Sequence, residues 1–386
     1  MSIKDKYAFA GAGVSRLGKI PDRSSTELAV EAIEAAIADA DIDRADVDGY
    51  IYQPSFDGGP EGTSPLIATG LPSRFAWQLQ AGSTTGISSV ISAIGALEAG
   101  LCKACVVLYA TSAASNRLTI GAGSSTASSW GAHGFFAPVS TAAGMAQRYR
   151  HNYGLTERQL GHVAVTLRGY ANQRPEAVMH DRPLTMEEYL ATPYLVEPLR
   201  KYDCCLVNDG AVALIITSAD RARDLKRPPV YVMGYGLDHT QAQIPKGSDA
   251  LWHWDGFDVT AAKNNAFGTA GIVMEDVDVA MMYDAFTMFI LAGLEAYGVC
   301  GKGEAGAFVE EGHIGPNESF PCNTSGTNLS WGYMQGFTHL VEGVRQMRGD
   351  GGATQVKDAE ICLVTGLGGS MEPAIGSAAA CCILRR

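Results

Sequence analysis

The stretch from Cys322 to Phe337 combines residue types that a plain core segment would avoid. It reads Cys-Asn-Thr-Ser-Gly-Thr-Asn-Leu-Ser-Trp-Gly-Tyr-Met-Gln-Gly-Phe. Its three glycines let backbone or ligand approach closely, and its Asn and Ser side chains offer hydrogen bonds. This pattern predicts a glycine-rich turn that runs into a buried helix and carries a functional site.

A second candidate position lies where another helix begins. Residues 80–100 carry apolar side chains at helical spacing, while the remaining positions hold Ser, Ala and Gly instead of charges, which is typical of a helix packed on all sides. The apolar positions are Ile87, Val90, Ile91, Ile94 and Leu97. The helix is predicted to start near Ser83, where free backbone N–H groups and the positive end of the helix dipole favour developing negative charge.

The nine cysteines favour reduced core thiols over a disulfide framework, because the chain is long and their number is odd. Cys102-Lys-Ala-Cys105 has the spacing of a redox or metal pair. No second pair or histidine cluster accompanies it, and Cys105 opens an apolar run, so the buried-thiol interpretation is preferred. No metal or redox cofactor is expected.

Composition places the chain among soluble, cytoplasmic proteins. Its 386 residues are 46% apolar, yet no apolar run approaches the length of a membrane span, and the first residues lack a signal-peptide pattern. The net charge of −12 argues against binding to nucleic acid or anionic membranes. Residues 148–201 are an exception, with eight Lys or Arg against six Asp or Glu, and an anionic ligand or merely scattered surface charge would explain them equally well.

Hydrophobic periodicity predicts alternating strands and helices, the pattern of an α/β fold. Strands are expected at 7–13, 48–53, 104–110, 211–217, 277–283, 361–369 and 378–384, and helices at 26–39, from 83, 142–153, 156–173 and 287–298. Gly11-Ala-Gly13 lacks a third glycine at the dinucleotide-binding spacing, so it is weak support for a nucleotide site. The Ala, Ser, Gly and Thr-rich segment 112–129 is expected to be a connection.

An internal repeat divides the chain. Residues 40–51 and 270–281 share Ala, Ile, an Asp-Val-Asp core and a following apolar strand at an offset of 230 residues. In the same order, the helix after Ser83 and the strand from Ala104 match a helix after Ser330 and a strand at 360–367. Two halves built on one α/β unit should bring the two glycine-rich turns face to face.

Several motifs resemble those of the thiolase superfamily, nearest to its sterol carrier protein-type members, over almost the whole chain. The matching segments are Asn323 and Gly326 in the first stretch, Asp209-Gly-Ala, Leu184-Thr-Met-Glu-Glu-Tyr and Glu197-Pro-Leu. The resemblance implies a five-layer αβαβα thiolase fold with two duplicated halves and an inserted loop domain. We expect an N-terminal half at 1–118 completed by 203–227, the loop domain at 119–202 and a C-terminal half at 228–386.

The residues that carry thiolase chemistry differ here. By motif position, Ser83 stands where thiolases have their nucleophilic cysteine, and Tyr283 and Tyr333 stand at the two histidine positions. Gly366-Leu-Gly368-Gly369 replaces the second cysteine motif. A serine without a nearby base is a poor nucleophile, so thioester formation at Ser83 is not expected.

Tyrosine at both histidine positions resembles the thiolase-like aldolases of steroid side-chain breakdown. This resemblance implies retro-aldol cleavage of a β-hydroxyacyl-CoA to a ketone and a short acyl-CoA such as propionyl-CoA, with Tyr283 and Tyr333 as the catalytic pair and CoA present only as part of the substrate. Backbone N–H groups near Ser83 and Gly368, together with Asn323, are expected to stabilise the enolate oxygen. Alternatives are an acyltransferase that uses Cys322 or Ser83 as nucleophile, and a noncatalytic acyl-CoA-binding subunit.

The same resemblance implies protein partners. Chains of this family dimerise through the face of the buried helix, and the aldolases are one component of an assembly with a small partner that combines an oligonucleotide-binding-type barrel with a zinc ribbon. We therefore expect a homodimer and a heteromeric complex.

Overall fold

Nine strands form one mixed sheet in the computed structural model, which describes residues 3–53, 59–118, 137–238, 256–369 and 377–386. The strand order is β3-β2-β4-β7-β1-β8-β11-β10-β9. The strands are β1 (Tyr7–Val14), β2 (Val47–Tyr52), β3 (Phe75–Gln78), β4 (Ala104–Ser112), β7 (Asp209–Ser218), β8 (Val230–Asp238), β9 (Val279–Met281), β10 (Ile361–Gly369) and β11 (Ser377–Arg385). Strands β1 and β8 pair only at Ala8–Tyr231 and Phe9–Val230, so the sheet consists of two halves joined by a short seam.

The two halves have the same topology. From the outside toward the seam, the N-terminal half runs β2-β4-β7-β1 and the C-terminal half runs β9-β10-β11-β8. The first pair is parallel and the next two pairs are antiparallel in both halves. Strand β3 is an additional strand on the outer edge of the N-terminal half. The duplication predicted from the sequence repeat is therefore present in the strand order.

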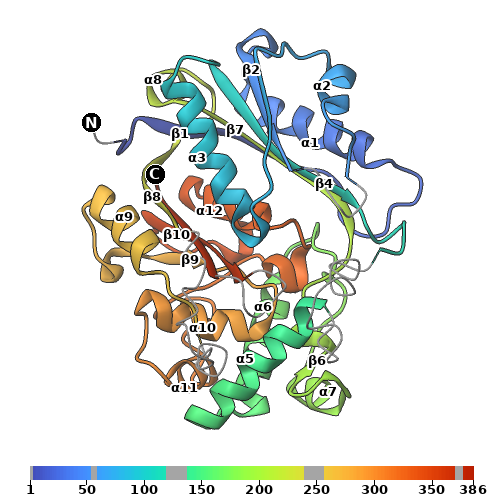
Figure 1. The fold of residues 1–386 in the computed structure, drawn as a ribbon, viewed down its shortest axis with the longest axis vertical. Helices are drawn as coiled ribbons and strands as arrows, with labels where there is room; N and C mark the ends of the chain where they lie inside the picture. Colours follow the sequence, from blue (N-terminus) through green and yellow to red (C-terminus); the bar gives the residue numbers. More distant parts are fainter. Residues whose placement is uncertain (1–2, 54–58, 119–136, 239–255, 370–376) are drawn as a thin grey trace, which may run out of the picture.

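Helices cover and separate these halves to give five layers. Helix α1 (Ser25–Ala40) packs on β1 and β7, and α9 (Thr260–Ala270) packs on β8 and β11 as the opposite outer layer. Helices α3 (Thr85–Glu98) and α12 (Phe337–Arg348) contact each other and strands of both halves. Figure 1 shows these two helices in the middle of the molecule, between the α1 and α9 sides. This arrangement confirms the predicted αβαβα thiolase fold.

Each predicted repeat segment occupies an equivalent place. Helix α1 ends at Ala40 and α9 ends at Ala270, and the next residue in each case is left-handed. In the N-terminal half a single 3₁₀ turn at Arg44–Asp46 leads into β2, and in the C-terminal half one at Met274–Asp276 leads into β9. The same sequence pattern thus folds into the same helix–turn–strand unit in both halves.

Glycines let the outer helices lie directly on their strands. A Cβ atom at Gly11 of β1 would come within 2.2 Å of the Ala36 carbonyl oxygen of α1. At Gly236 of β8 it would come within 1.8 Å of the Ala262 carbonyl oxygen of α9. The glycines of Gly11-Ala-Gly13 therefore allow close helix–strand packing. This role needs no third glycine, so the segment is explained without a dinucleotide-binding site.

The inserted region is mainly helical and lies below the sheet in Figure 1, beside α10 and α11. Its elements, with α10 and α11, are α5 (Ala137–Tyr153), α6 (Glu157–Asn172), α7 (Met186–Ala191), β5 (Tyr194–Val196), β6 (Leu199–Arg200), α10 (Thr287–Tyr297) and α11 (Ala305–Glu310). Helix α6 begins with the predicted capping box, in which Thr156 and Gln159 bond each other's backbone. Most of the expected connection at 112–129 lies outside the described residues. Two short helices, α2 (Ser64–Thr69) and α8 (Ala219–Arg223), complete the fold.

The segment 322–337 differs from its predicted form. A single π-helical turn spans Thr327–Trp331, and the buried helix α12 starts only at Phe337, so the helix expected after Ser330 begins later. Left-handed backbone at Asn323, Gly326, Thr327, Gln335 and Gly336 interrupts regular helix formation. Strand β9 is also shorter than predicted and ends at Met281, which places Tyr283 in the loop that follows. None of the helices in the described ranges is long and apolar enough to cross a membrane.

Candidate active site

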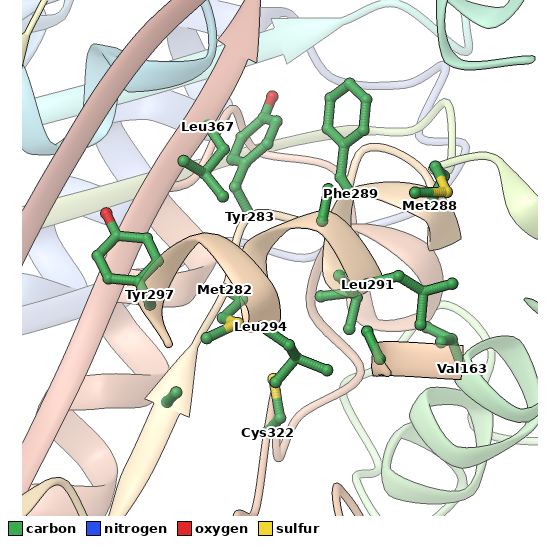
Figure 2. Close-up of a cluster of buried hydrophobic side chains, with 14 of the residues drawn as sticks. Val163, Met282, Tyr283, Met288, Phe289, Leu291, Leu294, Tyr297, Cys322 and Leu367 are labelled. Carbon is green, nitrogen blue, oxygen red and sulfur yellow. The ribbon is translucent and has the colours of Figure 1, made fainter. Parts of the chain in front are cut away.

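Tyr283 follows strand β9 and is held from several sides. Its backbone N–H donates to Thr365 Oγ1 on the neighbouring strand β10 at 3.1 Å. Its ring stacks on His339 of α12, with ring centroids 5.8 Å apart and planes 22° apart. The side chain is almost completely buried. Figure 2 shows the Tyr283 ring beside Leu367 of β10, with its hydroxyl pointing away from the apolar cluster.

Tyr333 lies between the π turn and α12. Its backbone N–H donates to Asn208 Oδ1 at 2.7 Å, and its hydroxyl donates to Gln335 Oε1 at 2.5 Å. The side chains of Tyr333 and Tyr283 lie close enough to each other for each to shift the pKa of the other. The two tyrosines are 50 residues apart in the sequence and lie near each other in the fold, and their catalytic role stays a prediction.

Burial keeps both tyrosines protonated near neutral pH. Desolvation raises the pKa of Tyr283 and that of Tyr333 well above the ordinary value of tyrosine. Interaction between the two side chains lowers the pKa of Tyr283 and further raises that of Tyr333. The pair therefore has the character of two neutral phenols.

Ser83 lies beside Gly368 and close to Tyr283. It belongs to the 3₁₀ turn Gly82–Thr84 that leads into α3. A Cβ atom at Gly368 would lie 2.0 Å from Ser83 Oγ, so that glycine is required for the close approach. A Cβ atom at Gly336 would lie 3.5 Å from the Tyr283 ring and 3.9 Å from the Ser83 carbonyl oxygen. Ser83, Gly336, Gly368 and Tyr283 therefore surround one small region.

Two helix N-termini meet in this region. A Cβ atom at Gly86, in the first turn of α3, would lie 3.3 Å from the carbonyl carbon of Gly336, the residue that precedes α12. Free N–H groups and aligned peptide dipoles make each helix start favourable for negative charge. The geometry can therefore stabilise an oxyanion next to the tyrosine pair.

Asn323 has a different environment from the one predicted. Its Oδ1 accepts from the Met282 N–H at 2.6 Å, and its Nδ2 donates to the Met282 carbonyl at 2.7 Å. Its side chain is fully buried, and its backbone N–H donates to Ala280. Because both ends of the amide bind the residue before Tyr283, Asn323 fixes the loop that carries Tyr283 and does not present its amide to a ligand.

Asp284 and His339 form a buried pair that the sequence motifs did not reveal. His339 Nε2 lies 2.8 Å from Asp284 Oδ1, and both side chains are fully buried. Asp284 also accepts from Thr327 and from the N–H groups of Asn328 and Leu329, so it anchors the π turn that leads to Tyr333. Only a weak sequence signal pointed to this pair: one carboxylate follows an apolar strand, and one histidine lies within a buried helix.

Cys322 is poorly placed for a nucleophile. Figure 2 shows its sulfur and the Tyr283 hydroxyl at opposite ends of the apolar cluster, with Met282 between them. Complete burial raises the pKa of its thiol, which disfavours the thiolate form. Ser83 also lacks a hydrogen-bonded carboxylate or imidazole among the residues that the structure describes, so neither side chain is activated there.

Other predicted ligand features belong to the core. Cys102 and Cys105 are both buried, and a Cβ at Gly49 would lie 2.6 Å from Cys102 Sγ, consistent with core thiols. In the described ranges, no group of three His, Cys, Asp or Glu side chains could hold a metal ion. Within the basic region, Arg174 pairs with Glu342 and Arg200 pairs with Glu157, so part of its positive charge is neutralised internally.

Comparison with known proteins agrees with this fold. A family model described as thiolase C-terminal domain-like matches residues 240–385. The 17-hydroxy-3-oxo-4-pregnene-20-carboxyl-CoA lyase of Mycobacterium tuberculosis is 34% identical over 94% of this chain and 96% of its own length. The steroid side-chain-cleaving aldolase of Thermomonospora curvata is 32% identical over 93% of this chain and 94% of its own length.

A solved structure of an Ltp2–ChsH2(DUF35) aldolase is also similar, with a TM-score of 0.86, 30% identity and coverage of 100% of this chain and 99% of that one. An acetyl-CoA acetyltransferase of Methanothermobacter thermautotrophicus is 30% identical over 94% of this chain and 96% of its own length. The chain therefore belongs to the thiolase superfamily, and these similarities confirm the resemblance to its steroid side-chain-cleaving aldolases.

Proposed function

We propose that this chain is a thiolase-like aldolase that cleaves a β-hydroxyacyl-CoA by a retro-aldol reaction. The observation that carries the proposal is the placement of two buried tyrosines, Tyr283 and Tyr333, near each other and beside the meeting point of two helix N-termini. Named lyases and aldolases at 32–34% identity over almost the whole chain support it. Since those relatives are named for steroid substrates, we propose the CoA thioester of a steroid side chain as the substrate.

The reaction needs one proton to move from the β-hydroxyl oxygen to the α-carbon. As the bond between the α- and β-carbons breaks and its electron pair moves toward the thioester enolate, one tyrosine oxygen accepts the hydroxyl proton and passes its own proton to the other tyrosine. The β-carbon becomes the ketone. In the same concerted step the other tyrosine gives its own proton to the α-carbon, so neither tyrosine becomes cationic and both end protonated. No covalent enzyme intermediate is needed.

The relay suits tyrosines with raised pKa values. Holding an unperturbed tyrosine ionised at pH 7 already costs about 4 kcal/mol, and burial increases this cost. A relay between neutral hydroxyls avoids it, because neither tyrosine carries a full charge for long. Gln335 supports the relay, since its amide can accept from Tyr333, as it does here, or donate to it after rotation.

The enolate oxygen requires separate stabilisation. We propose that backbone N–H groups at the start of α3, near Ser83, supply it together with the backbone around Gly368. Ser83 contributes its backbone in this scheme, and its hydroxyl is not a nucleophile. Asn323 acts indirectly, because its amide holds Met282 and thereby the Tyr283 loop.

The test is incubation of the protein, purified from its native host together with any bound partner, with 17-hydroxy-3-oxo-4-pregnene-20-carboxyl-CoA, whose tertiary alcohol lies β to the thioester. Retro-aldol cleavage gives equal amounts of a 17-keto steroid and propionyl-CoA without added CoA. An acyltransferase would need free CoA as a second substrate, and a binding subunit would return the substrate unchanged. Either of these two results would refute the proposal.

We further propose that the active form is a homodimer that also binds a small partner with an oligonucleotide-binding-type barrel and a zinc ribbon. The solved neighbour is named as a complex of Ltp2 with ChsH2(DUF35). Strand β3 supports a dimer, because it pairs only with β2 within the described chain and leaves Trp77 54% exposed at the sheet edge. Sedimentation gives the mass of the purified chain, and purification from the native host identifies bound proteins. A monomer isolated alone would contradict both expectations.

A further inference from the structure

His339 contacts Tyr283 and both of its neighbours in the chain. Its ring stacks on the Tyr283 ring, with centroids 5.8 Å apart and planes 22° apart. Its Nε2 lies 2.8 Å from Asp284 Oδ1 and 3.0 Å from the Met282 carbonyl oxygen. The imidazole plane is therefore fixed by the residues on either side of the tyrosine that it covers.

Stability alone is a weak explanation for a histidine at this position. Asp284 retains three other donors, from Thr327, Asn328 and Leu329, so it would not be left unpaired without the imidazole. His339 Nδ1, in contrast, is buried and has no hydrogen-bond partner in the described part of the chain. A buried nitrogen without a partner is unfavourable, and an apolar side chain would avoid it.

We propose that His339 is a positioning residue for the reaction, a role that rests on the proposed function. Its ring, oriented through Nε2, covers one face of Tyr283 and fixes the tilt of the phenol and thereby the direction of its hydroxyl. Proton transfer depends on such placement, and a displacement of about 1 Å can cost on the order of 100-fold in rate. His339 itself does not touch the reacting atoms.

Two substitutions at His339 distinguish the contribution of its flat ring from that of its N–H donor. His339→Gln keeps an N–H donor for Asp284 but removes the flat ring, whereas His339→Phe keeps a flat ring and removes the donor. For His339→Gln we expect kcat to fall about 30-fold, with KM for the acyl-CoA within about 3-fold, because the loss is one of placement. Its melting temperature should stay within about 2 °C of wild type. His339→Phe keeps a flat ring over Tyr283, so kcat should fall less than in His339→Gln, and any change in its melting temperature reports the loss of the Nε2 bonds to Asp284 and the Met282 carbonyl.

A purely structural role would give the reverse order, with activity following stability, and that result would overturn the proposal. Wild-type kcat in His339→Gln would overturn it even if His339→Phe fails to fold. A readout without catalysis is the ¹⁹F spectrum of protein labelled with 3-fluorotyrosine, in which Tyr283→Phe identifies the Tyr283 signal. We expect that signal to shift and broaden in His339→Gln, and an unchanged signal would refute positioning. Failure of the wild type to cleave any substrate would refute the proposed function, while the fluorine signal would still decide this inference.

Discussion

Removal of one hydroxyl from the tyrosine pair should separate catalysis from stability. Tyr283→Phe and Tyr333→Phe keep the ring and its packing, so both variants should fold and bind acyl-CoA. Each should lower kcat about 100-fold or more, which corresponds to roughly 2.7 kcal/mol in the activation barrier and is the usual scale for losing a general acid or base. The loss should appear in kcat, because the hydroxyls act in the chemical step.

The two variants should differ in stability. Tyr333→Phe leaves the buried Gln335 Oε1 without its donor, and an unpaired buried acceptor costs about 1–3 kcal/mol. Tyr283→Phe leaves the bond between Tyr333 and Gln335 intact and should cost less than about 1 kcal/mol. Denaturant unfolding of both proteins measures this difference, and cleavage of the steroid thioester measures kcat.

Tyr297→Phe is the matched control. Tyr297 is fully buried at the last position of α10, and its hydroxyl donates to the Ala380 carbonyl at 3.4 Å, whereas Tyr283 precedes this helix. This variant should lose stability without losing kcat. Near-wild-type activity in both Tyr283→Phe and Tyr333→Phe, together with loss of activity in Ser83→Ala, would refute the tyrosine relay and restore a serine nucleophile.

Three further outcomes follow from the site. Burial raises the pKa of both tyrosines, so the neutral relay predicts a kcat that is flat between about pH 7 and 9. A free phenolate base instead predicts that kcat rises about tenfold per pH unit. A pH series of initial rates distinguishes the two mechanisms. Gly368→Ala should lower kcat at least about 10-fold, because the new Cβ would lie 2.0 Å from Ser83 Oγ. Gly169→Ala is the control and should keep wild-type kcat, because that position on α6 faces open space. Equal activity of the two variants would contradict the role of the Ser83 region. Cys322→Ala should keep kcat within about 3-fold in the same assay, and an inactive but folded variant would support a relocated nucleophile.

Much of the scaffold could be predicted from local patterns. Apolar periodicity located most strands and helices because helix and strand periods differ, and the Asp-Val-Asp repeat identified equivalent units since each encodes the same helix end and strand. The chemistry of Tyr283 and Tyr333 came from their place in motifs. The two side chains lie near each other, and their catalytic role stays a prediction.

The support of the site could not be predicted in this way. His339 lies 55 residues from Asp284 in the chain, and no spacing rule connects them. The π turn and the left-handed backbone at Gln335 depend on bonds to Asp284, Asn208 and Tyr333 that form only in the folded chain. Asn323 was predicted to bind the substrate, but a buried amide can hydrogen-bond equally well to a substrate or to a backbone segment. Only its contacts with Met282 decide between these two roles.

The duplicated fold explains how the reaction can change while the scaffold stays. Helices α3 and α12 are equivalent elements of the two halves, and their N-termini meet beside Tyr283. In the proposed mechanism, these helix starts stabilise the oxyanion, so the stabilisation depends on backbone and is independent of the side chain at position 83. With serine at that position we expect no acyl-enzyme, and we propose the enolate as the species that the same backbone stabilises. Two neutral tyrosines then suffice, because retro-aldol cleavage moves a single proton from oxygen to carbon and leaves the net charge of the pair unchanged.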